Sequence, residues 1–320
     1  MAPMAGLTTL PFRRLVRRWG AGLVHTEMIS SHGIAYGNRR TLDYLACGDD
    51  EHPIGYQLFG AVPRILACAA VVCVEAGADL IDLNMACPVR KVLKTGAGAA
   101  LLGTPELAEA CVKATVAAVE GAVPVTVKIR AGLRAGDEAG HRLAPRLVAG
   151  GAAAITIHPR TAAQLYRGQA DHAITLALAR ELEVPVIASG DIGVTLPDGT
   201  IDRATCAGLR DGGVAAVAVA RAALGRPWVF RELLTGDSPP PPAVRLAELK
   251  RFVAAAVDDR GERAVGHLRQ FWPRFRRSDT IDKPLALELM RASSVTAITA
   301  LLEAHVCGGT DPGADDGGAV

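Results

Sequence analysis

The chain has 320 residues, of which 50% are hydrophobic, 21% charged and 4% aromatic. That apolar content excludes a disordered or low-complexity protein, because it is enough to build a large core. The formal net charge is only +2, so no overall electrostatic field marks a nucleic-acid binder. The length fits one large domain with a smaller one, or two domains of middle size.

Seven cysteines occur, an odd number, and neither a Cys-x-x-Cys pair nor a zinc-type histidine pair accompanies them. We therefore expect reduced thiols and no metal site. The N-terminus shows no signal segment, and the longest apolar stretches are too short to span a bilayer. The sequence predicts a cytoplasmic protein without membrane association, and it implies no protein partner.

Short runs rich in β-branched residues alternate with longer runs rich in Ala, Leu and Arg through residues 1–235. Glycines follow most of the longer runs, as expected at helix ends. The short runs predict strands at 22–28, 54–59, 80–84, 123–129, 154–158, 184–189 and 214–220. The longer runs predict helices at 10–19, 63–76, 105–119, 137–149, 172–181, 201–211 and 227–234.

This alternation indicates a (β/α)8 TIM barrel of the α/β class. Seven strands are predicted and the barrel needs eight, so residues 1–4 would have to supply the first strand. The alternative, a doubly wound open sheet, would require a Gly-x-Gly-x-x-Gly turn after an early strand, and none occurs. Only Met1, Ala2 and Pro3 precede the first turn, although a strand needs about five residues. We therefore expect a misassigned start or a truncated first strand.

A run of four prolines, Pro239 to Pro242, marks the end of the barrel, because consecutive prolines form a stiff linker. After it, apolar residues recur at helical spacing, which predicts a small bundle of helices. We expect a catalytic barrel over residues 1–236, a helical domain over 237–304 and a disordered tail over 305–320.

In a TIM barrel the active site collects side chains from the carboxyl ends of the strands. Most of the predicted strand ends carry a polar or ionisable residue directly after an apolar run. Buried polar groups cost free energy unless they are paired, so one common site explains these residues better than separate structural roles do. The residues are Pro3, Met4, Glu27, Gln57, Asn84, Cys87, Lys128, Arg130, His158, Arg160, Ser189, Gly190, Asp191, Ala220 and Arg221.

Three of these residues indicate the ligand. Gly190 and Arg221 follow the last two predicted strands, where TIM barrels commonly hold a phosphate group. Lys128 has no carboxylate next to it in the sequence, and a lysine in this place would stabilise the negative charge of a reduced flavin. A phosphosugar site without a flavin is the alternative.

A series of short elements follows in order along the barrel. It consists of Ala2-Pro3-Met4-Ala5-Gly6-Leu7-Thr8, Thr26-Glu27-Met28, Gln57-Leu58-Phe59-Gly60, Asp82-Leu83-Asn84-Met85-Ala86-Cys87-Pro88, Val127-Lys128-Ile129-Arg130, His158-Pro159-Arg160-Thr161, Gly190-Asp191-Ile192 and Leu224-Gly225-Arg226-Pro227-Trp228. This series resembles the tRNA-dihydrouridine synthase family, in particular its bacterial DusB-like members. The Asn-Met-x-Cys-Pro element is the most specific part of the resemblance.

The resemblance implies reduction of specific uridines in tRNA to 5,6-dihydrouridine, by a bound FMN that NADPH reduces. It implies FMN contacts from Pro3, Met4, Gln57, Lys128, His158, Ser189, Gly190, Asp191, Ala220 and Arg221, and uracil contacts from Asn84, Arg130 and Tyr166. It also implies hydride transfer from flavin N5 to uracil C6, with Cys87 as the general acid that protonates C5. An ordinary buried thiol is the alternative for Cys87, but its place on a Cys-Pro turn argues against that.

Three departures from the family pattern lie near the expected phosphate. Ser189 stands where the family usually has Asn, Ala220 stands where it usually has Gly, and the loop at 193–201 is longer than usual. A methyl group at position 220 would crowd a phosphate that approaches the backbone. We expect these departures to weaken FMN binding without abolishing function.

Arginine-rich stretches near aromatic residues support an RNA substrate, because guanidinium groups bind phosphates and rings stack on bases. They are Arg13, Arg14, Arg17, Arg18, Arg39 and Arg40 near the N-terminus, and Arg269, Arg274, Arg276, Arg277 and Lys283 near Trp272 and Phe275. We expect the helical domain to bind tRNA, although its rings suit a core equally well. Two alternatives remain: an FMN barrel oxidoreductase that acts on a free pyrimidine, and a catalytically decayed tRNA-binding protein.

Overall fold

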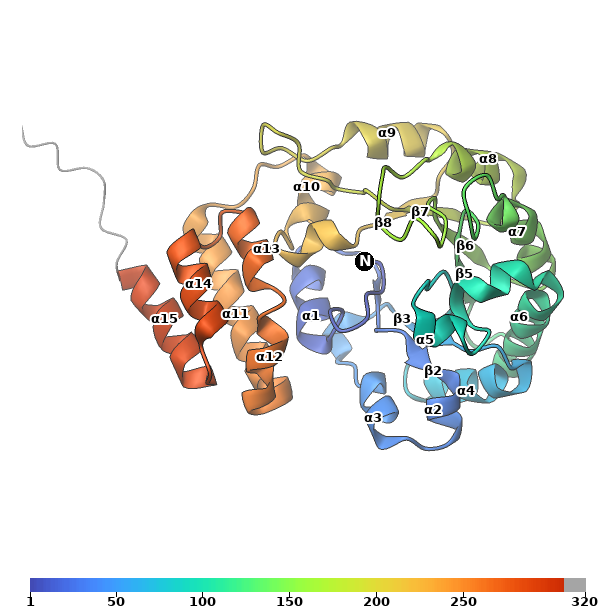
Figure 1. Cartoon of the computed structure of the whole chain (residues 1–320), viewed down its shortest axis with the longest axis horizontal. Helices are drawn as coiled ribbons and strands as arrows, with labels where there is room; N and C mark the ends of the chain where they lie inside the picture. The colour runs from blue at the N-terminus through green and yellow to red at the C-terminus, as the bar shows by residue number, and fades with distance from the viewer. Residues whose placement is uncertain (308–320) are drawn as a thin grey trace, which may run out of the picture. The chain divides into compact units, whose positions relative to one another are not determined.

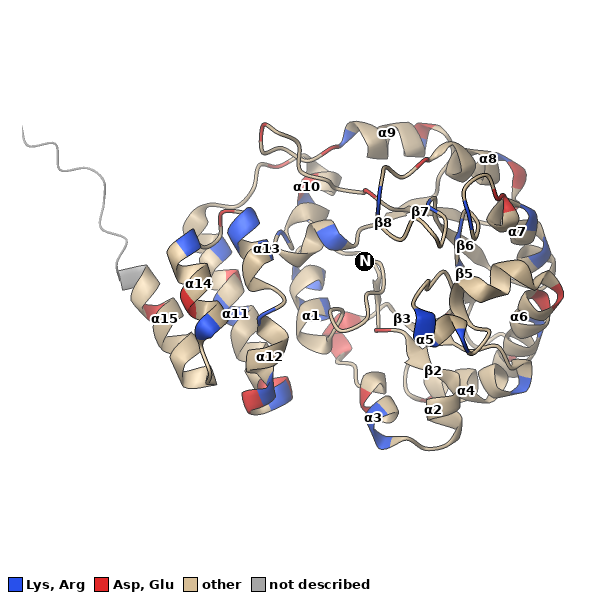
Figure 2. Ribbon diagram, viewed as in Figure 1, with Lys and Arg blue, Asp and Glu red and all other residues tan. Residues whose placement is uncertain are grey.

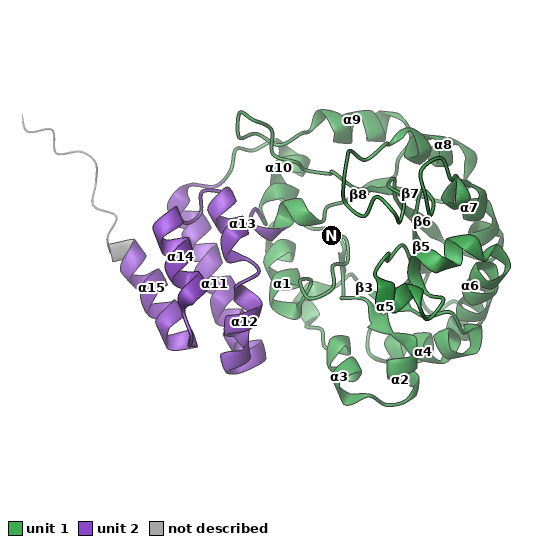
Figure 3. Cartoon of the chain, viewed as in Figure 1, with its two compact units in different colours: residues 1–223, 227–239 green, residues 224–226, 240–320 purple. Residues whose placement is uncertain are grey.

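The computed structural model describes residues 1–307, and these form two compact units, coloured separately in Figure 3. Unit 1 comprises residues 1–223 and 227–239, and unit 2 comprises residues 224–226 and the chain from Pro240 onward. The unit boundary in the proline run is therefore at 239/240. Most of the predicted tail over 305–320 lies outside the described residues, and residues 305–307 continue the last helix.

Unit 1 is built on a parallel sheet whose strands pair in chain order, with helices around the outside of the strands (Figure 1). The strands are β1 (Val24–His25), β2 (Ile29–Ser30), β3 (Ile54–Phe59), β4 (Leu80–Met85), β5 (Val125–Arg130), β6 (Ala154–His158), β7 (Val186–Ser189) and β8 (Ala216–Ala218). Both β1 and β2 pair with β3. This is the (β/α)8 barrel that the alternation of elements predicts.

The helices of unit 1 mostly follow the predicted segments. They are α1 (Leu10–Arg18), α2 (Ser31–Ala35), α3 (Arg39–Leu42), α4 (Pro63–Glu75), α5 (Arg90–Leu93), α6 (Pro105–Val119), α7 (Ala139–Ala149), α8 (Ala173–Glu181), α9 (Ala204–Asp211) and α10 (Val229–Thr235). Proline begins both α4 and α6, where its missing N–H costs nothing. Gly77 follows α4 with a φ of +93°, a left-handed conformation that favours glycine at a helix end. None of the helices within residues 1–307 is long and apolar enough to cross a membrane.

The N-terminal part of the barrel differs from the prediction in two places. The predicted strand at 22–28 contains only the two residues of β1, and β2 begins just after it at Ile29. The regular ladder is interrupted after β1, where the hydroxyl of Thr26 accepts the backbone N–H of Gln57 (3.1 Å). Residues 1–4 form no strand. Instead, the N–H of Ala2 donates to the carbonyl of Val219 (2.8 Å), next to β8, and the amino group of Met1 donates to the carbonyl of Leu23, next to β1.

The register of the strands decides which side chains point into the barrel. Parallel neighbours in register point to the same face, and successive residues alternate between faces. Gln57 pairs with Asp82, and Asp82 pairs with Thr126. Two residues nearer the carboxyl ends of the same two strands, Asn84 pairs with Lys128. The interior of the barrel is therefore lined by polar side chains in successive layers, while the alternate residues form the apolar core toward the helices.

Unit 2 is helical, as the spacing of its apolar residues predicts. Its helices are α11 (Pro242–Arg260), α12 (Ala264–Leu268), α13 (Trp272–Arg277), α14 (Lys283–Arg291) and α15 (Val295–Cys307). The rings of Phe252 and Phe271 meet edge to face with centroids 4.9 Å apart. Trp272 and Phe275 are fully buried with them. The aromatic side chains thus form the core of the unit and are not exposed for stacking on bases.

Candidate active site

A continuous series of hydrogen bonds joins the neighbouring strands β3 and β4 and ends at the backbone of the predicted acid. The Oδ2 atom of Asp82 accepts from Nε2 of Gln57 (2.6 Å), and Oε1 of Gln57 accepts from Nδ2 of Asn84 (2.8 Å). The Oδ1 atom of Asn84 then accepts the backbone N–H groups of Ala86 (3.1 Å) and Cys87 (2.9 Å). The side chains of two predicted site residues therefore hold the backbone of a third.

Cys87 lies on a tight turn after β4 and is half-buried. Its carbonyl accepts the backbone N–H of Ala99 (3.0 Å), and a Cβ at Gly98 would come within 2.6 Å of that carbonyl. Only glycine fits at position 98, whose φ is also +63°. Burial raises the pKa of the Cys87 thiol above its ordinary value, although the charges of Arg130 and Lys128 act in the opposite direction. The thiol is therefore protonated at neutral pH.

Lys128 is buried and has no hydrogen-bond or ion-pair partner within residues 1–307. It lines a cavity of about 720 Å³ together with His25, Asp82 and Thr156. Most of the wall of this cavity comes from β8, α9, α10 and residues 20–23, and of the other predicted site residues only Pro3 lines it. Burial and the neighbouring charge of Arg130 lower the pKa of its ammonium group to about 8. The charge of Asp82 acts in the opposite direction and offsets part of this effect. A buried cation that makes no ion pair among the described residues is suited to an anionic or electron-rich ligand.

His158 lies among four cationic side chains. Burial, and then the charges of Lys128, Arg130, Arg160 and Arg221, lower the pKa of His158 to about 2. The imidazole is therefore neutral and can donate one hydrogen bond and accept another. Its neighbourhood carries an excess of positive charge, which favours a phosphate or another anion in the same place.

Gly190 directly follows β7 and makes close contact with His158. A Cβ at position 190 would lie 2.7 Å from Cδ2 of His158, and the φ of Gly190 is +98°. Both observations require glycine here. Glycine at the carboxyl end of β7 therefore makes room for the His158 ring, and a phosphate contact from this backbone stays a prediction. Ser189, the residue before it, is buried.

Asp191 has a φ of +52° and serves as the centre of an ion-pair network. Its Oδ2 accepts from Nη2 of Arg160 (2.5 Å) and from the backbone N–H of Ala170 (2.9 Å). Its Oδ1 accepts from Nη2 of Arg221 (3.3 Å). The carboxylate of Asp191 thus faces arginines and a loop, so a direct FMN contact from this side chain stays a prediction. Arg221 is half exposed and can turn toward another anion.

Tyr166 lies on the loop after β6 and is 57% exposed. Its ring stacks on His158 at a centroid distance of 6.1 Å, and the guanidinium groups of Arg130 and Arg221 lie 5.6 and 5.1 Å from its centroid. Arg130 fixes this loop through Nη1, which donates to the carbonyl of Leu165 (2.8 Å), and its Nε donates to the carbonyl of Ala86 (2.8 Å). One buried arginine therefore connects the loop of Tyr166 to the turn of Cys87.

Met4 and Ala220, two further predicted FMN contacts, make hydrogen bonds to residues close to them in the chain. The N–H of Met4 donates to the hydroxyl of Thr8 (3.2 Å), and its carbonyl accepts the N–H of Thr8 (3.0 Å). The carbonyl of Ala220 accepts the N–H of Ala223 (3.1 Å). The roles predicted for Pro3, Met4 and Ala220 therefore stay predictions. The loop at 193–201 folds into a small hairpin of its own, in which Thr195 and Ile201 form an antiparallel bridge.

Sequence reasoning missed Asp82 and Thr126 as members of the site. Both lie inside predicted strands and not at their ends, so a search restricted to strand ends passes over them. The sequence does contain a pattern that could have identified Asp82 and Thr126. Polar residues recur at every second position of β4 and β5, so they share one face of each strand. Asp82 and Asn84 follow this spacing in one strand, and Thr126, Lys128 and Arg130 follow it in the next. Within residues 1–307 no group of acidic, His and Cys side chains could hold a metal ion.

Several arginines that suggested an RNA surface are engaged within unit 1. Arg13 is buried and pairs with Glu51 (2.6 Å), and Arg14 pairs with Asp50 (2.8 Å). Arg17 donates to the carbonyl of Ala21 (2.6 Å). The exposed basic residues of this predicted set are Arg18 at the end of α1 and Arg39 and Arg40 on α3.

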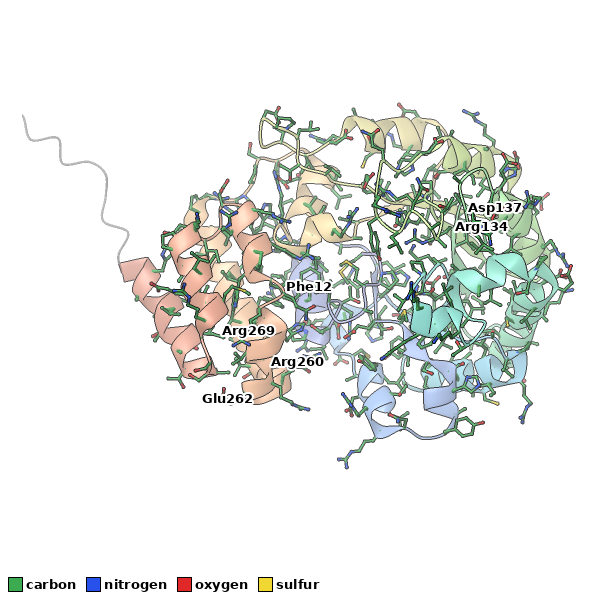
Figure 4. The ribbon with its side chains drawn as sticks, viewed as in Figure 1. Phe12, Arg134, Asp137, Arg260, Glu262 and Arg269 are labelled. Atoms are coloured by element: carbon green, nitrogen blue, oxygen red, sulfur yellow. The ribbon has the colours of Figure 1, made fainter. Side chains whose placement is uncertain are left out.

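The helical unit presents basic side chains on α13 and α14 (Figure 2). Arg276 and Arg277 are exposed on α13, and Lys283 is exposed at the start of α14. Arg269, labelled in Figure 4, donates to the carbonyl of Ala292 (3.0 Å), so it contributes to the structure of the unit. Arg269, Arg276, Arg277 and Lys283 are thus the exposed members of the predicted basic set that the burial pattern identifies here, and RNA binding by this unit stays a prediction.

The fold is that of the TIM-barrel class, and Cys87 and Lys128 lie toward the carboxyl ends of its strands. The model of the family described as "Dihydrouridine synthase (Dus)" matches residues 1–271. The tRNA-dihydrouridine synthase B of Xanthomonas campestris pv. campestris is 41% identical over 249 residues, which are 76% of this chain and 72% of the relative. The protein of the same name from Klebsiella pneumoniae is 39% identical over 260 residues, 80% of this chain and 78% of the relative.

The chain therefore belongs to the dihydrouridine synthase family, a family of flavin-dependent oxidoreductases. The solved structure of a mutant morphinone reductase in complex with tetrahydroNAD matches the barrel with a TM-score of 0.53. That match covers 77% of this chain and 89% of the other at 13% identity, so it supports the fold alone.

Proposed function

We propose that this protein reduces specific uridines in tRNA to 5,6-dihydrouridine, with a bound FMN that NADPH reduces. The observation that carries the proposal is the Cys87 thiol, which burial keeps protonated on a turn held by Asn84. Saturation of the uracil ring requires a proton at C5, and a positioned thiol is a suitable general acid.

The residues present fit FMN by their chemistry. Lys128 brings a buried positive charge without a partner among the described residues, and four cations surround the neutral His158. Gly190 lets the His158 ring pack against the backbone after β7, because a Cβ there would lie 2.7 Å from that ring. We propose that Gln57, Lys128 and His158 hold the ring system and that Gly190 and Arg221 hold the phosphate. When bound, FMN supplies a hydride for C6 of the uracil.

We propose that Asn84, Arg130 and Tyr166 receive the uracil. The Tyr166 ring is exposed next to His158, Arg130 and Arg221, so it offers a surface on which a base can stack. A uridine inside folded tRNA must leave its stack to reach this place. The exposed arginines of unit 2 would hold the tRNA by its phosphates, which carry most of the affinity but no sequence information.

The first experiment measures flavin in the purified protein after denaturation. We expect FMN in an amount close to that of the protein, or uptake of FMN when it is added. Absence of flavin even with excess FMN would contradict every enzymatic proposal and would favour a tRNA-binding protein without activity.

The second experiment quantifies dihydrouridine at each position of tRNA from cells with and without the gene. We expect one set of positions to lose the modification. Unchanged tRNA, together with reduction of free uracil or a related pyrimidine by the flavin-loaded protein, would support the alternative of a small-molecule oxidoreductase.

A further inference from the structure

Asp82 is a buried acidic residue to which the proposed reaction assigns no role. Its side chain lies in the barrel interior and is 2% exposed. The Oδ1 atom accepts the hydroxyl of Thr126 (2.7 Å), and Oδ2 accepts Nε2 of Gln57 (2.6 Å). Burying a carboxylate is unfavourable unless hydrogen bonds compensate the lost hydration. An interior that required only packing would hold an aliphatic residue here.

The chemistry of the carboxylate determines the orientation of its neighbours. An ionised carboxylate only accepts hydrogen bonds, whereas a side-chain amide can present either its NH2 group or its oxygen. Gln57 must therefore turn its NH2 group toward Asp82, which leaves its oxygen for the NH2 group of Asn84. The oxygen of Asn84 is then the atom that faces the turn.

The backbone of Cys87 is the last member of this series. The Oδ1 atom of Asn84 accepts the N–H of Cys87 at 2.9 Å and the N–H of Ala86 at 3.1 Å. If the Gln57 amide were reversed, its oxygen would face the carboxylate and its NH2 group would face the NH2 group of Asn84. Both contacts would be repulsive. Gln57 is 1% exposed and Asn84 7%, so little water can compensate a wrong orientation.

We propose that Asp82 is a positioning residue that, through Gln57 and Asn84, sets the direction of the hydrogen bonds which hold the Cys87 turn for proton donation. This inference rests on the proposed function, because it assigns Asp82 to the reaction in which Cys87 is the acid. Thr126 has a supporting part, since its hydroxyl occupies the second oxygen of the carboxylate and fixes its plane.

Two substitutions at position 82 separate positioning from mere filling of space. Asp82→Leu removes the acceptor, whereas Asp82→Asn can turn its oxygen toward Gln57 and keep the direction of the series. We expect single-turnover reduction of tRNA uridine by flavin-loaded Asp82→Leu to be about 10- to 100-fold slower, as for a misplaced catalytic group. Asp82→Asn should retain most of the rate. Equal loss in both variants would overturn the proposal.

Thr126→Val keeps the carboxylate and tests the same series if Asp82→Leu fails to fold. We expect it to slow uridine reduction in the same direction but less. Its matched control is Thr115→Val on α6, where a buried threonine hydroxyl donates to the carbonyl of Cys111 (2.8 Å). Thr115→Val should lower stability without changing the rate. If Thr126→Val and Thr115→Val lower stability equally and neither changes the rate, Asp82 and Thr126 are only structural.

A double-mutant cycle shows whether Asp82 acts through Asn84. If it does, Asp82→Leu combined with Asn84→Ala should be no slower than Asn84→Ala alone, because coupled residues are not additive. Additive losses would contradict the proposed series. A second measurement follows alkylation of Cys87 by iodoacetamide in flavin-free protein, using the mass of its peptide. We expect the rate of Cys87 alkylation to change several-fold in Asp82→Leu and to stay the same in Thr115→Val.

The outcomes separate this inference from the proposed function. If Cys87→Ala reduces uridine as fast as the parent, the assignment of the acid is wrong and the positioning of that acid is wrong with it. If Cys87→Ala is inactive while flavin-loaded Asp82→Leu keeps the parent rate, only the inference about Asp82 is overturned.

Discussion

Replacing Cys87 by alanine removes the proposed acid with little disturbance of the turn that carries it. The hydrogen bonds that hold this turn are made by the backbone N–H of Cys87 to Asn84 and by its carbonyl to Ala99. Neither bond depends on the sulfur atom. The side chain is only half-buried, so the cavity left by its removal is small and open to water. We therefore expect Cys87→Ala to fold and to bind FMN as the parent does.

The expected loss follows from the protonation of the thiol. An ordinary cysteine, with a pKa of about 8.5, is roughly nine-tenths protonated at pH 7.5. Burial raises the pKa of Cys87 further, so practically every molecule carries the proton. Its removal forfeits general acid catalysis in full, a loss of about 10²–10⁴-fold, or about 3–5 kcal/mol of barrier. Serine at this position should be nearly as poor, because a hydroxyl is a far weaker acid.

The assay is single-turnover reduction of tRNA uridine by the prereduced, flavin-loaded protein. Cys68→Ala is the matched control, because Cys68 is exposed on α4 and makes no part of the site. The raised pKa keeps the thiol protonated through neutral pH, so the parent rate should stay level from about pH 6 to 7.5, below the range in which Lys128 loses its charge. A parent rate in Cys87→Ala would refute the assignment.

Three further predictions concern other parts of the chain. Lys128→Met should stabilise the flavin-free protein by about 3 kcal/mol in urea unfolding at pH 7, since a pKa lowered from 10.5 to about 8 makes the buried charge costly at about 1.4 kcal/mol per unit. That gain should shrink as the pH rises from 8 to 10.5, and it should be accompanied by lost FMN affinity. Gly190→Ala should purify with little FMN, because its Cβ would lie 2.7 Å from the His158 ring at a φ of +98°; a normal flavin content would show that the ring can move aside. Arg276→Gln combined with Arg277→Gln should weaken tRNA binding and reduce the slope of log affinity against log salt by about 2, as two phosphate contacts are lost. An unchanged slope in a filter-binding titration would direct attention to Arg39 and Arg40 on α3.

Much of the barrel could be predicted from local sequence alone. A strand of the parallel sheet is a short apolar run, and a helix between two strands is a longer run that ends at glycine, so both leave a signal in adjacent residues. The predictions for β3, β6 and α6 match the structure residue for residue. The strand ends also revealed Lys128 and His158, because a polar residue directly after an apolar run is visible without knowledge of its neighbours.

The sequence could not predict features that depend on residues far apart in the chain. Arg13 was assigned to an RNA surface, but its partner Glu51 lies 38 residues away and becomes adjacent only in the folded barrel. The break between β1 and β2 coincides with a hydrogen bond between Thr26 and Gln57, which are 31 residues apart. Local propensity contains no information on such pairs.

The candidate site likewise combines features that the sequence predicts with features that only the folded chain creates. Its residue types and their order along the chain were sufficient to indicate the family, and through that resemblance to predict an acid at Cys87 and a flavin contact at Lys128. Only the strand register decided that Gln57, Asp82 and Thr126 lie side by side, because register sets which side chains of neighbouring strands share a face. The direction of the hydrogen bonds from Asp82 to Cys87 follows from that proximity and from the inability of a carboxylate to donate, and so it was decided by the tertiary structure.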